Sequence, residues 1–167
     1  MYLIDLVQPD INVPRSINLE RDKNSLSVIN DYQLTSKTLE IFNRFIRAIQ
    51  GEKVSAWSLT GPYGMGKSSY CNFLLSITGP KNDTRTKAAR KALKSADPVL
   101  YRDFKTGLSQ ISGQRGFLRV SVTAGYESVN HSLARGLHEA LQAVEGDPIR
   151  EALIESISKL RQEKIIP

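Results

Sequence analysis

The sequence predicts an α/β fold with a mainly parallel sheet and flanking helices. Two apolar runs suited to buried strands, residues 54–60 and 117–123, are each followed by a stretch with helical spacing, residues 68–77 and 128–144. A glycine-rich segment joins the first strand to its helix. Alternating strands and helices are typical of parallel sheets. With 167 residues and 40% hydrophobic content, the chain has enough apolar side chains for one domain.

The first 30 residues are expected to form an N-terminal arm, because Pro9 and Pro14 interrupt its apolar runs and the polar stretch 20–25 follows. Residues 31–167 are then expected to be the N-terminal portion of the domain. Thr35 or Ser36 can cap a helix that Gly51 ends and that carries apolar residues at helical spacing, namely Leu39, Phe42, Ile46 and Ile49. That helix should pack on the sheet.

The glycine-rich segment is followed by the expected helix 68–77, which Gly79 and Pro80 end. Residues 83–95 look helical and basic. Asp97 and Pro98 supply a cap and a first-turn proline for a short second helix.

In the second half, Ser128 can cap a helix with one apolar face, made of Val129, Leu133, Leu137, Leu141 and Val144. A last helix is expected from Asp147, burying Leu153, Ile154, Ile157 and Leu160.

Residues 61–68 carry the pattern of a phosphate-binding P-loop: glycine, four residues, glycine, lysine and serine. Gly61, Gly64 and Gly66 would let the backbone turn tightly around phosphates. Lys67 would neutralise the β and γ phosphates, which makes it the candidate catalytic residue, and Ser68 would bind Mg²⁺. Ser69 adds an N–H at the helix start. The predicted ATP-binding residues are Gly61, Pro62, Tyr63, Gly64, Met65, Gly66, Lys67, Ser68 and Ser69.

The capped helix, the strand ending in Leu59-Thr60-Gly61 and the P-loop resemble the start of AAA+ and STAND-type ATPases over residues 30–80. The resemblance implies a P-loop NTPase fold with a five-stranded sheet, so the chain is expected to be the N-terminal part of a larger, oligomeric ATPase. It also implies that residues 31–34, through Tyr32 and Leu34, border an adenine pocket. Residues 16–22 and 57–64 are similar to large bacterial ATPases of anti-phage defence islands.

Hydrolysis needs an acidic residue at a strand end to hold magnesium and polarise water, and no such motif is evident. In residues 99–103, Arg102 interrupts the apolar run before Asp103; in residues 122–127, Glu127 follows a glycine. The guanine-specific signature is absent, which favours ATP over GTP. We therefore expect an ATP-binding ATPase module that couples nucleotide binding to assembly or to work on nucleic acid. The alternatives are a non-hydrolysing nucleotide switch and a nucleic-acid adaptor.

The net charge of +6 is concentrated in residues 81–119, which hold ten basic and three acidic residues. Lys87, Arg90, Lys91 and Lys94 would share one helix and could contact nucleic-acid phosphates. No interleaved aromatic residue is available to stack bases, so a solvated face is the favoured interpretation.

His131, Arg135 and His138 would lie on one helix face. A solvated face is again favoured, with Arg135 as a candidate finger for a neighbouring subunit's nucleotide. Cys71 is expected in the core. No apolar run is long enough to span a membrane and no secretion signal is evident, so we expect a cytoplasmic protein without membrane contact.

Overall fold

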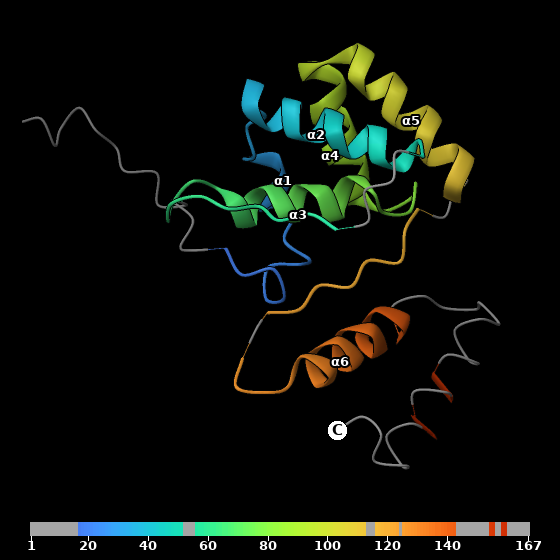
Figure 1. The fold of residues 1–167 in the computed structure, drawn as a ribbon. Coiled ribbons are helices and arrows are strands. Elements are labelled where there is room, and N and C mark those ends of the chain that lie inside the picture. The colour runs from blue at the N-terminus through green and yellow to red at the C-terminus, as the bar shows by residue number, and fades with distance from the viewer. Residues whose placement is uncertain are drawn as a thin grey trace, which may run out of the picture.

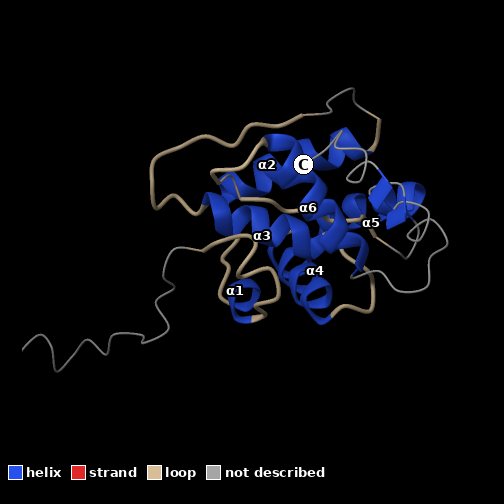
Figure 2. Ribbon diagram, turned by 90° about the horizontal axis from the view of Figure 1, so that it is seen from below, coloured by secondary structure: helices blue, strands red, loops and turns tan. Residues whose placement is uncertain are grey.

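The computed structural model describes residues 17–51, 56–112, 116–123, 125–142, 154–155 and 158–159. Its helices (Figure 1) are α1 (Ser27–Asn30), α2 (Ser36–Ile49), α3 (Lys67–Ile77), α4 (Thr84–Ala96), α5 (Pro98–Ser112) and α6 (Val129–Gln142). Within these ranges no residue lies in a β-strand, and Figure 2 shows the described chain as helix and loop alone. The fold of this part is therefore all-helical.

The predicted α/β fold with a mainly parallel sheet is wrong for the described residues. Residues 56–60 and 117–123, both expected to be strands, run without helix and without a partner strand. The N–H of Phe117 donates instead to the carbonyl of Thr78 at 2.9 Å, and the N–H of Thr123 donates to the Glu20 carboxylate at 2.8 Å. An apolar run becomes a strand only where another strand can satisfy its backbone groups. Val54 and Ser55 lie outside the described residues.

Three phenylalanine rings form the centre of the hydrophobic core. Phe42 of α2 is fully buried, with its ring centroid 6.1 Å from that of Phe73 on α3 and 5.3 Å from that of Phe104 on α5. Helix α4 adds Ala89 and Leu93 to the same cluster. Four helices from successive parts of the chain therefore share one core.

Local capping explains where these helices begin, and the caps at Thr35 and Asp97 were predicted. The Thr35 hydroxyl accepts from the N–H of Thr38 at the start of α2, and the Asp83 carboxylate accepts from the N–H of Arg85 at the start of α4. The Asp97 carboxylate accepts from the N–H of Leu100 in α5, which runs for fifteen residues and is not the short helix expected. The single residue Asp97 joins α4 to α5, so these helices pack directly on one another.

The N-terminal arm is more ordered than expected where the structure describes it. The Asn18 side chain accepts from the N–H groups of Glu20 and Arg21 and so forms a turn. Ile29 of α1 is buried in the core cluster with Phe42. Ile29 of the expected arm thus contacts the helical core, and residues 1–16 lie outside the described part.

Helix α6 lies apart from α2 and α5 (Figure 1) and packs on residues 117–123. A Cβ at Gly136 would come within 2.4 Å of Val122 Cγ1, so α6 approaches this segment through its small residues. The predicted apolar face is therefore only partly correct: Leu141 is buried, but Val129 is 72% and Leu133 50% exposed. Val144, Asp147, Leu153, Ile157 and Leu160 lie outside the described residues.

Candidate functional site

The predicted phosphate loop is an exposed turn that leads directly into α3. Gly64 and Gly66 have φ angles of 84° and 75°, a region that side-chain-bearing residues rarely adopt. A Cβ at either position would meet no atom within 4 Å. Glycine is therefore required here by the backbone conformation, and the space beside the loop is open.

The first turn of α3 offers backbone donors at this loop. The first bond into the helix joins the N–H of Tyr70 to the carbonyl of Gly66 at 2.9 Å. The N–H groups of Lys67, Ser68 and Ser69 have no acceptor among the described residues. Free N–H groups and the positive end of the helix dipole together favour an anion at this point.

Lys67 folds back over the loop. Its ammonium group donates to the carbonyls of Gly61 at 2.8 Å and Pro62 at 2.7 Å. Two neutral carbonyls leave its charge uncompensated, so a phosphate could replace them as the partner. The hydroxyls of Ser68 and Ser69 have no hydrogen-bond partner in the described part of the chain, which leaves Ser68 free to bind a metal ion.

The side chains of the loop itself point into solvent. Tyr63 is 91% and Met65 70% exposed, and Pro62 is also exposed. The loop presents backbone and the Lys67 charge, and its own side chains supply no wall for a nucleotide base.

The residues expected at the adenine pocket lie against the core. The ring of Tyr32 packs on Phe73 with centroids 5.2 Å apart, and burial raises the pKa of the Tyr32 hydroxyl. Leu34 packs against the same cluster. Phe73 follows Lys67 by six residues, about 9 Å along a helix axis. Tyr32 therefore lies beside the middle of α3, and the role of Tyr32 and Leu34 at adenine stays a prediction.

Neither candidate hydrolytic acid is placed as a free carboxylate beside the loop. Glu127 accepts from Arg135 and from the Ser132 hydroxyl, both at 2.8 Å, and these hydrogen bonds lower the pKa of its carboxyl. Asp103 is exposed on α5, 3.8 Å from Arg102. Both acids have partners other than a metal or a nucleotide.

The predicted polar face of α6 is engaged within this chain. Arg135 forms ion pairs with Glu127, Glu20 and Glu139, at 2.8, 3.3 and 3.6 Å, and the bond to Glu127 is the main reason its pKa is raised. His131 lies 3.9 Å from Glu127, and His138 contacts Gln142. The described residues contain no cluster of three or more metal-ligating side chains.

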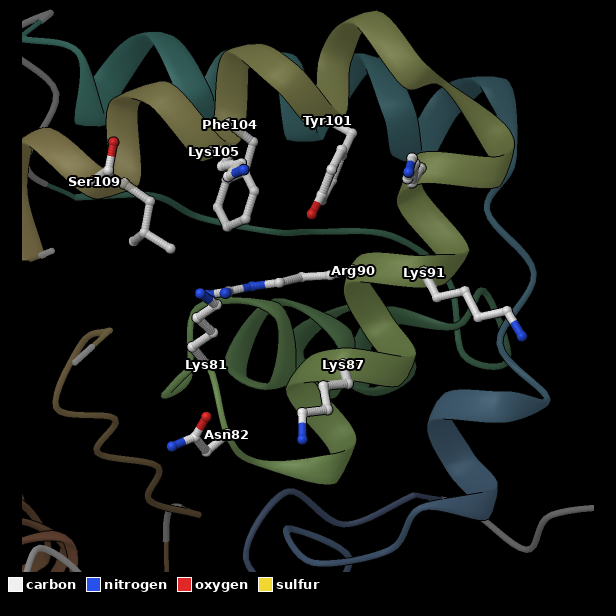
Figure 3. A pocket seen from close by; sticks show the side chains of 11 residues that line it. Lys81, Asn82, Lys87, Arg90, Lys91, Tyr101, Phe104, Lys105 and Ser109 are labelled. Carbon is white, nitrogen blue, oxygen red and sulfur yellow. The ribbon is translucent and has the colours of Figure 1, made fainter. Parts of the chain in front are cut away.

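The basic residues predicted on one helix separate into two kinds. Lys87, Lys91 and Lys94 are exposed on α4, whereas Arg90 turns inward and donates to the carbonyls of Ile77 and Gly79 at 3.2 and 3.1 Å. They line a cavity whose other wall is α5 (Figure 3).

Sequence reasoning missed that second wall of the cavity. Tyr101, Phe104, Lys105 and Leu108 follow one another at helical spacing, which places them on one face of α5. That spacing, with the tight connection at Asp97, was the available signal that aromatic side chains would face the basic helix.

Comparison with protein-family models, with curated proteins and with solved structures gives no match for this chain. In the described part, none of the helices combines the length and apolar character that a membrane span needs.

Proposed function

We propose that this chain binds ATP with Mg²⁺ through residues 61–69 and serves as the nucleotide-binding module of a cytoplasmic ATPase assembly. The observation that carries the proposal is the junction of the loop with α3. Three N–H groups without an acceptor in the described chain, two glycines at positive φ and the Lys67 ammonium converge there. Each of these features favours a polyphosphate.

The sequence pattern supports the division of roles within the loop. The N–H groups of Lys67, Ser68 and Ser69 would bind phosphate oxygens, and Lys67 would exchange its carbonyl partners for the β and γ phosphates. The unpaired Ser68 hydroxyl would be the protein ligand for Mg²⁺. Magnesium would then neutralise part of the phosphate charge.

Binding without efficient hydrolysis is the expected behaviour of these 167 residues. Glu127 is held by Arg135 and Ser132, and Asp103 is paired with Arg102. A water-polarising acid for a hydrolysing assembly would therefore come from elsewhere. A nucleotide-controlled switch fits the same observations, as does a role in anti-phage defence with assembly or nucleic acid as the coupled step.

A second candidate function is contact with a nucleic-acid backbone through α4. The observation in its favour is that Lys87, Lys91 and Lys94 are exposed and form no ion pair with any described acidic residue. Such contacts depend strongly on salt.

The central experiment is calorimetric titration of ATP with Mg²⁺ into Lys67→Ala. We expect at least about a tenfold loss of affinity, because charge-assisted hydrogen bonds to phosphate are removed. The thermal unfolding midpoint should stay near that of the wild type, since the hydrogen bonds of the Lys67 ammonium to described residues are with two loop carbonyls.

Two further variants control this measurement. Lys37→Ala removes an exposed lysine of α2 whose ion pair among the described residues is with Glu40, and it should leave affinity unchanged. Ser68→Ala should weaken binding with Mg²⁺ present and have little effect in EDTA. Equal ATP affinity in wild type and Lys67→Ala would contradict the proposal.

A further inference from the structure

A second cationic site is formed between α4 and α5, away from the phosphate loop. It is a cavity of about 540 Å³, within the range of roughly 300–1,000 Å³ that is usual for small-molecule sites. In Figure 3, Lys81, Asn82 and Lys87 come from the lower wall, and Tyr101 and Phe104 come from α5 above.

The lining of this cavity carries one sign of charge. Six of its residues are basic and none is acidic; the basic ones are Lys81, Lys87, Arg90, Lys91, Lys94 and Lys105. None of the six forms an ion pair with an acidic side chain that the structure describes. A concave surface of this kind concentrates positive potential and attracts anions.

The fixed, half-buried side chain of Arg90 distinguishes this cavity from a patch of surface lysines. Its guanidinium is fixed by the carbonyls of Ile77 and Gly79 and lies over the Phe104 ring, 6.0 Å from the ring centroid. Burial lowers its pKa, although the group remains charged. The protein therefore holds a half-buried cation with neutral partners in the lining of the cavity, where an anion would supply the missing countercharge.

The opposite wall carries aromatic and apolar side chains beside Lys105 and Ser109. Tyr101 points from α5 toward the cavity in Figure 3, and Leu108 lies two helical turns further along the same face. Phe104 is itself buried, so Tyr101 is the ring available to a ligand. An aromatic face next to a group of cations suits a ligand that joins a planar ring to phosphate.

We propose that the α4–α5 cavity binds a nucleotide, with its phosphate on Lys81, Lys87 and Arg90 and its base against Tyr101. This site is distinct from the phosphate loop and does not depend on it. A free nucleotide and one nucleotide of a single-stranded nucleic acid share this chemistry. An acidic peptide would match the cations but would leave the Tyr101 face without a planar partner.

The test uses the full chain carrying Lys67→Ala, so that the loop contributes little. ADP is titrated in EDTA by calorimetry, beside a fluorescein-labelled oligodeoxythymidylate followed by anisotropy. Lys81→Gln combined with Lys87→Gln removes two phosphate contacts. Tyr101→Leu removes the ring while keeping apolar volume. The matched control is Lys37→Gln with Arg102→Gln, which removes the same charge from exposed positions outside the cavity.

We expect ADP affinity to fall at least about tenfold in the double lysine variant and at least about fivefold in Tyr101→Leu, with the control unchanged. If the oligonucleotide is the ligand, the same variants should weaken it, and the slope of log affinity against log salt should flatten by about 1.4 for two lost contacts. Weaker binding of either probe to the cavity variants supports the site. The probe whose binding is weakened shows whether the ligand is a free nucleotide or a nucleic acid.

Thermal melts of every variant test whether the fold is kept. Binding of neither probe, or binding that both cavity variants leave unchanged, overturns the proposal. Pyrophosphate binding as tightly as ADP, with no effect of Tyr101→Leu, overturns the assignment of the ring and leaves a plain anion site.

Discussion

The helices around Phe42 and the helix α6 are held by different forces. In α2, α3, α4 and α5, aromatic and aliphatic side chains interlock in one buried cluster. Helix α6 packs on residues 117–123 and is also joined to residues 17–23 by charge: Arg135 pairs with Glu20, and Lys23 pairs with Glu139 at 2.9 Å. Its residues Val129 and Leu133 remain exposed.

These two kinds of contact should respond differently to salt and pH. Burial in a close-packed core contributes free energy that salt and moderate pH do not remove. Partly exposed ion pairs contribute little and respond to both. The α2–α5 core should therefore persist under conditions that release α6.

The largest effect is expected from Phe42→Ala. Removing a fully buried ring that contacts Phe73 and Phe104 should lower the free energy of unfolding by about 3–5 kcal/mol. Urea denaturation followed by circular dichroism measures this loss. Phe45→Ala, on the same helix but only half-buried, is the matched control and should cost less. Equal losses would mean that the core is not centred on Phe42.

A smaller loss is expected from Arg90→Gln. Arg90 donates to two carbonyls at the end of α3, and removing these charge-assisted bonds should lower the free energy of unfolding by about 1–2 kcal/mol. Lys91→Gln, one residue along on the exposed side of α4, should change it by less than about 0.5 kcal/mol. Denaturation curves in which the two variants coincide would show that Arg90 is only a surface cation.

Acid should loosen α6 before the core. Hydrogen bonds from Arg135 to Glu127 and from Lys23 to Glu139 hold the pKa of each carboxyl below its ordinary value of 4.5. Their stabilisation is complete above that value and is lost as the pH falls through the lowered folded values. Hydrogen exchange, corrected for intrinsic rates, should show earlier loss of protection in α6 than in α2. Simultaneous loss would contradict the comparison.

The smallest effect is expected from Leu133→Ser. Half of Leu133 is exposed, so in the isolated chain the free energy of unfolding should change by less than about 0.5 kcal/mol. Sedimentation of wild type and variant over a range of concentrations is the second readout. A shift in association state would show that another copy covers α6.

Local signals predicted the helices better than the overall architecture. Thr35 and Asp97 each cap the helix that their sequence position indicated, because capping depends on a few neighbouring residues. The sheet was wrong because strand formation depends on a distant partner. Residues 56–60 and 117–123 have strand composition but no strand pairing in the described chain.

The glycine-rich loop and the α4–α5 cavity show the same contrast between local signals and signals that depend on distant residues. Residues 61–68 form one contiguous pattern in the sequence, and α3 begins at Lys67, one residue before the expected start. The cavity was not predictable, because Arg90 and Tyr101 belong to different helices and only their packing brings them together. The inward turn of Arg90 also depends on the carbonyls at the end of α3, which no local pattern reveals.

Helix α3 runs from the glycine-rich loop to the α4–α5 cavity. Its N-terminal N–H groups adjoin the glycine-rich loop, and its C-terminal carbonyl of Ile77 accepts from Arg90, which lines the α4–α5 cavity. Eleven residues give it a length of about 16 Å. If α3 moves along its axis as a rigid body when a ligand binds at one end, the carbonyls at its other end move by the same amount. By thermodynamic linkage, an effect of cavity occupancy on loop affinity would be equal in both directions.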